Sequence, residues 1–563
     1  MKKIGLLLCT ISIVANAFTQ NTNGWHLKDN AADGYMGMSV AKAYEFLKQK
    51  NLKSNLTIVA VIDSGIDTLH EDLKPILWTN TKEKQGNGID DDKNGYVDDE
   101  HGWNFLGGKN NTAVKNDSYE GARVYYNWKS KYENADPKTV ANKAEYAMWK
   151  RAKENVIGNE DDKDAAMNLI YMQRALTGLH SADSTLKIAI NKVEYTGNEL
   201  DAFIPADAQQ KKAKAALLAL MKSNNMLDKT NKEFMDGFDE YVAGELAKQD
   251  AKVNAPKNYR LDITGDDETN WNTRGYGNND VFSVTPNHGT HVSGIIAAAR
   301  NNGKGMDGVA DNVQIMLCRA VPDGDEHDKD IALAIRYAVD NGAKIVNMSF
   351  GKSFSPYKKW VDDAVEYAQS KGVLLVHASG NDSKNLDNPN EYNFPTARLL
   401  NGKTATNWIE VGASGDPALK AKYGTKAGGE ATESYAASFS NYGKKNVDIF
   451  SPGVKIYATI PGTTTYGNNQ GTSMASPAAA GVCAILKSYF PKLTPEQIKN
   501  IVETTAVKPA YKTGKPGTDG DDLVNLFDIS KTGGIINAYE AVKLAYTMST
   551  NKLKKPTPVK KKK

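Results

Sequence analysis

The run LTIVAVID, residues 56–63, decides the fold. It is short, rich in β-branched residues and followed at once by a Ser-Gly turn, which is typical of a buried strand. Four further runs share this character, and helical patterns at 290–300, 328–341 and 357–371 alternate with them; the runs are 313–320, 343–349, 372–379 and 408–414. The alternation predicts an α/β fold, namely a doubly wound, mostly parallel sheet flanked by helices.

Polar residues follow several of these predicted strands. Asp63, Ser349 and Asn381 each fall at or just after the end of a run. Functional groups of such sheets collect beyond the carboxyl ends of the strands. We therefore expect a functional site at this rim of the sheet.

The alternation of strand and helix stops between residues 111 and 256. This stretch is rich in Lys, Glu, Ala and Asn and predicts an inserted α-helical subdomain with a solvated charged face. Apolar residues recur in it at helical spacing, for example Leu217, Leu220 and Met221, or Met167, Ile170 and Tyr171. The predicted division of the chain is a signal peptide (1–17), an N-terminal segment with the first part of the sheet domain (18–110), the insertion (111–256), the remainder of the sheet domain (257–545) and a disordered basic tail (546–563).

The first 17 residues have the pattern of a signal peptide. Lys2 and Lys3 precede an apolar stretch, and Ala15 and Ala17 supply small residues for cleavage near Ala17. We expect export to the periplasm, the cell surface or the medium. The apolar run is shorter than the roughly 20 residues that span a bilayer, so no stable membrane insertion is expected. Lipidation is disfavoured because Cys9 follows leucines rather than small residues.

The amino-acid composition is ordinary and excludes few classes of function. Lys and Arg number 70 against 67 Asp and Glu, apolar residues make up 40% and charged residues 24%. These are ordinary globular values, so no nucleic-acid partner is expected. We also expect a monomer. Cys318 and Cys483 each lie in an apolar run, which favours buried free thiols over a disulfide.

Four segments carry candidate chemistry, and each has a plainer interpretation when taken alone. Asp63 in DSGID and Asn381 in HASGND are also typical of turns. The two histidines of NHGTHVSG (287–294) could cap a helix or bind zinc, although the HExxH spacing of zinc peptidases is absent. Ser473 in GTSMASP stands at the mouth of an Ala-rich helix and could be a simple N-cap.

Together the four segments supply a nucleophile, a base, a carboxylate to orient the base and a donor for an oxyanion, as serine catalysis requires. Their order along the chain is Asp, His, Ser, the order of subtilisin. The motifs DSGID, HGTHVSG, NMSFG, ASGN and GTSMASP resemble those of the subtilisin-like serine peptidases over about 56–110 and 257–545.

This resemblance implies a secreted serine endopeptidase that acts on polypeptides and needs no cofactor for catalysis. It assigns Asp63, His288 and Ser473 to the catalytic triad and Asn381 to the oxyanion hole, and it leaves His291 a structural role.

The resemblance also implies a substrate-binding strip. The backbone of Ser349, Phe350 and Gly351 would pair with an extended peptide. Lys352 after the strip and Asp382 after the oxyanion donor would place opposite charges beside the primary pocket.

Two other classes of protein compete with this interpretation. A pseudoprotease that binds peptides, or an adhesion module, would lack a triad residue, and none is missing. A lipase or esterase would show GxSxG and place Ser before His, and neither occurs. Two roles stay open for the insertion: it could replace a folded propeptide, or it could overhang the cleft and restrict substrates.

A calcium loop is predicted in GNGIDDDKNGYVDDEHGW, residues 86–103. Oxygen ligands alternate there around the sharp turn at Gly95, as calcium requires. These candidate ligands are Asp90, Asp92, Asn94, the Tyr96 carbonyl and Asp98. The loop is not an EF-hand, because His101 replaces the final Glu and no helix precedes it; a solvated acidic turn is the alternative.

Overall fold

The computed structural model describes residues 22–158, 163–223, 226–227, 229–282, 284–419, 435–518 and 522–553. These residues form a seven-stranded parallel sheet with the order β2-β3-β1-β4-β5-β6-β7. The strands are β1 (Thr57–Asp63), β2 (Gly102–Asn104), β3 (Val313–Arg319), β4 (Ile345–Met348), β5 (Leu374–Ala378), β6 (Trp408–Ser414) and β7 (Ile449–Pro452). The predicted doubly wound parallel sheet is confirmed. The short edge strands β2 and β7 were not predicted.

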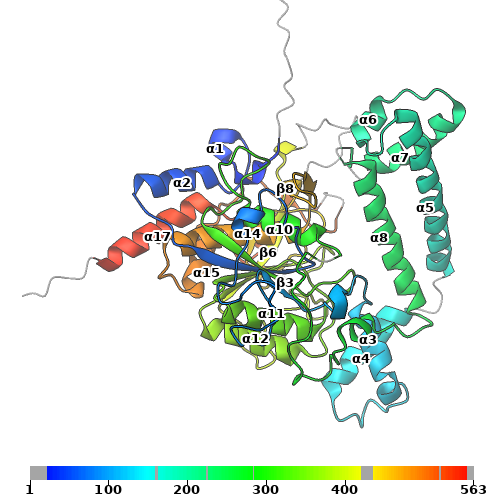
Figure 1. The fold of residues 1–563 in the computed structure, drawn as a ribbon, viewed down its shortest axis with the longest axis horizontal. Coiled ribbons are helices and arrows are strands. Elements are labelled where there is room, and N and C mark those ends of the chain that lie inside the picture. Colours follow the sequence, from blue (N-terminus) through cyan, green and yellow to red (C-terminus); the bar gives the residue numbers. More distant parts are fainter. Residues whose placement is uncertain are drawn as a thin grey trace, which may run out of the picture.

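Helices cover both faces of the sheet. Successive side chains of a strand point to opposite faces, so each strand contributes apolar side chains to both cores. Val59 and Val61 of β1 lie in the core on one face, whereas Ala60 and Ile62 lie in the core on the other. Figure 1 shows helices α10 (Asn287–Ala297) and α14 (Thr472–Tyr489) over the first face, and α11 (Asp328–Asp340) and α12 (Lys358–Ser370) over the second.

The N-terminal segment belongs to the body of the domain. Helix α2 (Val40–Gln49) packs against α17 (Ala538–Leu553), and the Trp25 indole donates a hydrogen bond to the Val454 carbonyl at 3.0 Å. The remaining elements outside the insertion are η1 (Trp25–Leu27), α1 (Asn30–Asp33), η2 (Lys74–Ile76), η3 (Lys109–Asn111), β8 (Ile456–Thr459), β9 (Tyr466–Asn469), α15 (Pro495–Thr504), β10 (Thr513–Gly514), β11 (Leu523–Val524) and α16 (Leu526–Ile529).

The described residues between 111 and 256 are largely helical, and their helices divide into two groups. We call α3 and α4 the root; they share a small core with Phe354 of the sheet domain. We call α5–α8 the arm; they have a separate core that includes Leu186 and Leu217, and Figure 1 shows them standing beside the sheet. The bounds are α3 (Glu120–Tyr132), α4 (Lys143–Ile157), α5 (Lys163–Ile190), α6 (Gly197–Ala202), α7 (Ala208–Ser223) and α8 (Asn231–Asp250), followed by α9 (Tyr259–Thr264).

The helical spacing of apolar residues predicted the arm helices correctly, but not all of these apolar residues are buried. Leu217 and Met221 are buried in the arm core. Met167, Ile170 and Tyr171 are exposed, because the first half of α5 extends beyond the core that its second half shares with α7.

The structure also bears on the predictions for the cysteines and for the two ends of the chain. Cys318 and Cys483 are free and buried, as predicted. Helix α17 continues to Leu553, so the basic tail is not disordered from residue 546; the apolar face of this helix holds it against α2 and α14. The signal peptide, Cys9 and the end of the tail lie outside the described residues. In the part of the chain that the structure describes, no helix has the length and apolarity to cross a bilayer.

Candidate active site

The carboxyl end of β1 and the start of α10 bring Asp63 and His288 together. The Nδ1 atom of His288 lies 2.7 Å from Oδ1 of Asp63, which also accepts a hydrogen bond from the Ser64 backbone. Asp63 is buried, whereas the His288 side chain is 40% exposed. The carboxylate is therefore shielded while the imidazole can reach solvent or substrate.

Gly289 allows this contact. A Cβ atom on Gly289 would lie 2.1 Å from the Gly65 carbonyl oxygen and 3.2 Å from Asp63 Cβ. Only a residue without a side chain lets the first turn of α10 approach the end of β1 so closely. The glycine of HGTH is thus a geometric requirement for the Asp63–His288 pair.

Ser473 lies in the first turn of α14, at the N-terminal end that carries unpaired N–H groups and a positive dipole. Its hydroxyl donates a hydrogen bond to the Ser349 carbonyl at 3.1 Å. In return, the Ser349 hydroxyl donates to the Ser473 carbonyl at 3.0 Å. The predicted nucleophile and the predicted substrate strip are therefore in direct contact.

Asn381 has the orientation that an oxyanion donor needs. Its Oδ1 accepts hydrogen bonds from the Thr472 backbone N–H at 2.8 Å and the Thr472 hydroxyl at 2.9 Å. These bonds turn the amide nitrogen to the opposite side. A Cβ atom built on Gly471 would lie 3.5 Å from Asn381 Nδ2 and 3.6 Å from the Ser473 backbone nitrogen. The Asn381 amide nitrogen and the Ser473 backbone nitrogen thus lie near the same point beside Gly471.

The strip from Ser349 to Gly351 has an inner and an outer side. The Phe350 carbonyl accepts a hydrogen bond from Nε2 of His377 at 2.9 Å, and Lys352 forms an antiparallel bridge with Phe394. Because backbone groups alternate along an extended chain, Ser349 and Gly351 present theirs to the other side. A peptide could pair with these two residues.

His377 is a supporting residue that the sequence did not reveal. Its ring is fully buried, and Nδ1 lies 2.9 Å from Oε1 of Glu410. This histidine connects a buried carboxylate on β6 to the backbone of the strip. Its only local signal was its place in HASGND, which we interpreted for Asn381 alone.

Lys352 and Asp382 do not flank a pocket together, contrary to expectation. Lys352 is buried, and its Nζ contacts Glu120 at 2.7 Å and Asp328 at 2.9 Å. Burial alone would lower the pKa of Lys352, but the Asp328 and Glu120 carboxylates raise it above its usual value. Asp382 is exposed. Lys352 therefore fastens the root to the strip.

The two histidines of HGTH point to different partners. Nε2 of His291 lies 3.2 Å from the Gly467 carbonyl oxygen. Burial lowers the pKa of His291 to about 3, so this ring is neutral. His288 faces Asp63, so the pair does not converge as zinc ligands would.

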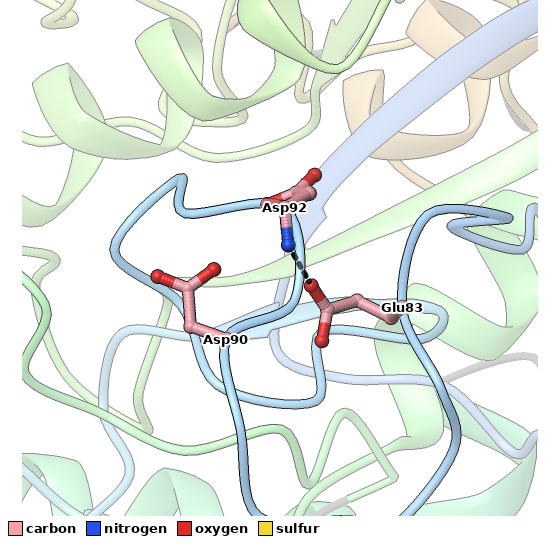
Figure 2. Close-up of side chains that lie close together, drawn as sticks. All are labelled: Glu83, Asp90 and Asp92. Carbon is pink, nitrogen blue, oxygen red and sulfur yellow. Dashed lines mark hydrogen bonds between the residues drawn. The ribbon is translucent and has the colours of Figure 1, made fainter.

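The acidic loop has a different cluster from the one predicted. Carboxylate oxygens of Glu83, Asp90 and Asp92 lie within 4.8 Å of one another (Figure 2). The Asp98 carboxylate instead accepts hydrogen bonds from the backbone of Asn87 and Gly88. Glu83 precedes the quoted loop and was therefore missed.

The Asn94 side chain, another predicted ligand, is engaged in hydrogen bonds within the loop. Asn94 Nδ2 donates to Asp99 at 3.0 Å, and Asn94 Oδ1 accepts from the Tyr96 backbone at 2.8 Å. The Tyr96 ring packs edge-on against Trp103 and Tyr337.

Comparison with known sequences agrees with this geometry. A sequence model described as the subtilase family matches residues 177–530, more than half of the 563 residues. The chain belongs to the subtilase family. The matched range includes His288, Asn381 and Ser473 and begins after Asp63.

Several characterised proteases are similar to parts of the chain. A thermophilic serine proteinase of Bacillus sp. (strain AK1) is 38% identical over 226 residues, which cover 39% of this chain and 47% of the relative. A cell wall-associated protease of Bacillus subtilis (strain 168) is 31% identical over 306 residues, covering 52% and 30%. Subtilisin BL of Lederbergia lenta is 35% identical over 240 residues, covering 42% and 75%. The chain thus spans half or less of the length of the first two relatives.

Among solved structures, one described as proteases from Pseudoalteromonas arctica PAMC 21717 has 28% sequence identity and a TM-score of 0.35, covering 48% of this chain and 74% of that one.

Proposed function

We propose that this chain is a serine endopeptidase that hydrolyses peptide bonds through Asp63, His288 and Ser473. The bond from Nδ1 to Asp63 places the imidazole proton on Nδ1 and the lone pair on Nε2. Nε2 takes the Ser473 proton as the hydroxyl oxygen attacks the substrate carbonyl, and returns it to the leaving amine. Water then releases the acyl group by the same steps.

Attack requires the Ser473 side chain to turn from the Ser349 carbonyl toward His288. Catalytic hydrogen bonds commonly tighten only in the substrate complex, so this rotation is consistent with the proposal. The negative oxygen of the tetrahedral intermediate would accept hydrogen bonds from Asn381 Nδ2 and the Ser473 backbone.

The convergence of these two donors beside Gly471, next to Ser473, is the observation that carries the proposal. An Asp–His pair and a helix N-terminus both occur without catalysis. Here the Asn381 oxygen is bound to Thr472, and the Asn381 amide nitrogen and the Ser473 backbone nitrogen lie near the same point beside the proposed nucleophile.

A fluorophosphonate probe followed by a casein digest tests the proposal. Wild type should be labelled at Ser473 and should degrade casein, whereas Ser473→Ala should do neither. Ser476→Ala, in the next turn of α14, is the matched control for labelling. An unlabelled wild type would favour a peptide-binding protein that lacks activity.

We also propose that Glu83, Asp90 and Asp92 hold a structural calcium ion. Three carboxylates this close repel one another, and Glu83 Oε2 is buried without a hydrogen-bond partner among the described residues. Hard oxygen ligands of this kind suit calcium. Melting should shift downward in EDTA for wild type and for the control Asp91→Asn. Glu83→Gln should melt lower and be insensitive to EDTA, and an unmoved wild-type melting temperature would reject the ion.

The N-terminal pattern supports a third proposal, that the protein is exported and acts outside the cytoplasm; we propose separately that it is a monomer. Expression of the full chain in a bacterial host, with N-terminal sequencing and light scattering of the exported protein, tests it. A mature protein that still begins at Met1 would contradict export.

A further inference from the structure

The root is attached to the chain segments that follow β3 and β4. The Glu120 carboxylate binds Lys352 at 2.7 Å, directly after the strip, and the Glu120 backbone donates to Asp325 at 2.8 Å. Backbone hydrogen bonds join Asp117 to Asp323 at 2.7 Å. These residues are largely buried, so the insertion is firmly attached to the sheet domain beside the strip.

The far end of the arm contacts the protein a second time. Lys229 Nζ lies 3.5 Å from Oδ1 of Asn469, which ends the β8–β9 hairpin four positions before Ser473. The same hairpin contacts His291, because the Gly467 carbonyl oxygen lies 3.2 Å from Nε2 of this histidine. Burial is the main cause of the low pKa of His291, and the Lys229 charge adds to it.

One helix connects the two attachments. Helix α8 begins at Asn231, just after Lys229, and runs for 20 residues to Asp250, a length of about 30 Å. At its end the Tyr126 hydroxyl of the root donates to the Ala251 carbonyl at 3.0 Å. A continuous chain of contacts therefore runs from Asn469, four positions before Ser473, through Lys229, α8 and the root to Lys352 after the strip.

Helix α8 packs closely on Tyr119 at the start of the root, because a Cβ atom on Gly244 would come within 2.7 Å of the Tyr119 hydroxyl. A cavity of about 300 Å³ lies beside this contact. Its lining residues are Tyr119, Gly237, Tyr241, Gly244, Glu245 and Lys248. Space thus remains between the second half of α8 and Tyr119.

We propose that α8, the root and the β8–β9 hairpin form a closed ring around the cleft, so that the substrates are extended polypeptide chains that thread beneath α8. Folded proteins, and segments held at both ends by folded domains, are excluded while the Lys229–Asn469 contact is closed. This inference rests on the proposed peptidase function.

Covalent closure of the ring tests the proposal in the full chain. The double variant Lys229→Cys/Asn469→Cys is treated with a short bismaleimide, to which the buried Cys318 and Cys483 should not react. Two substrates are compared: a linear fluorogenic peptide, and the same sequence as a linker between two folded domains. The cross-linked protein should cleave the linear peptide as before and lose cleavage of the two-domain substrate.

Opening the ring should have the opposite effect. Lys229→Ala should raise cleavage of the two-domain substrate relative to the linear peptide by about two- to fivefold, the range for loss of one exposed polar contact. Lys222→Ala, which removes a lysine paired with Asp201 inside the arm, should not change this ratio.

The outcomes separate this inference from the proposed function. If wild type cleaves both substrates and cross-linking changes neither rate, or lowers both equally, the ring is wrong and the peptidase stands. Failure of the cross-link to form in the folded protein also overturns the ring. If wild type cleaves nothing and resists the fluorophosphonate, the peptidase itself is wrong.

Discussion

At the residue scale, the chemistry depends on side chains whose orientation is set by neighbours. Asp63, His288, Asn381 and Ser473 could be predicted because each sits in a short motif of its own. His377 could not be predicted. Its contacts to Glu410 and to the Phe350 carbonyl join β5 to β6 and to the strip that follows β4, and no local pattern marks such a contact.

The proposed oxyanion donor gives the first prediction. Asn381→Ala removes the amide nitrogen that lies, with the Ser473 backbone nitrogen, near the space beside Gly471. Removal of one such donor in subtilisin itself lowers kcat by about 10²–10³, and we expect a similar loss here with little change in KM. Steady-state kinetics on a short peptide measures it. Asp382→Ala, the exposed neighbour, should stay near wild type, and an unchanged kcat in Asn381→Ala would remove this residue from the site.

The close approach of α10 to β1 gives the second prediction. Gly289→Ala must displace the helix from the Gly65 carbonyl, which separates His288 from Asp63. We expect a loss of kcat of at least about tenfold, because a misplaced catalytic group commonly costs that much or more. The matched control is Gly178→Ala in α5, where a Cβ meets nothing within 4 Å. Equal activity of the two variants would show that the contact tolerates movement.

At the element scale, the attachment of the root to the sheet is built from buried charges. The periodicity of residues 111–256 predicted helices but not this attachment, because its partners come from opposite ends of the insertion and from the segment after β3. His327 is the centre of the cluster: it lies 3.0 Å from Asp117 and also contacts Glu268.

This cluster makes stability depend on pH. Burial and the nearby Arg123 would lower the pKa of His327, but the Glu268 and Asp117 carboxylates outweigh them and raise it to about 9. A folded-state pKa above the unfolded value of about 6.5 stabilises the protein fully below pH 6.5, and this stability is lost as pH rises through 9. Burial also raises the pKa of Glu326, which acts in the same direction.

We therefore predict that the free energy of unfolding falls between pH 7 and pH 9.5, by up to about 3 kcal/mol from His327 alone. Denaturant titrations across this range measure it. His327→Gln should flatten the profile, whereas His180→Gln, a surface histidine paired with Asp239, should leave it unchanged. A wild-type profile that is flat up to pH 9.5 would mean that His327 is neutral at pH 7.

At the scale of the whole molecule, the chain has one large core system and a separate arm core. The alternation of strand and helix predicted the first, because short β-branched runs and helical runs are local signals. The placement of the arm across the cleft could not be predicted, since it depends on single contacts such as Lys229 with Asn469 between segments 240 positions apart. Burial could not be predicted from spacing alone either, since Met167, Ile170 and Tyr171 have helical spacing but are exposed.

Separate cores predict separate unfolding. Leu186→Ala empties a fully buried site in the arm core and should cost about 2–5 kcal/mol there. Because few contacts join the arm to the sheet, this loss should appear as faster hydrogen exchange in α5 and α7 while β4–β6 and fluorophosphonate labelling of Ser473 stay unchanged. Leu375→Ala, equally buried in β5, should accelerate exchange in the sheet and abolish labelling. If Leu186→Ala also destabilised the sheet, arm and sheet would unfold as one unit, and the ring around the cleft would be as rigid as the catalytic core.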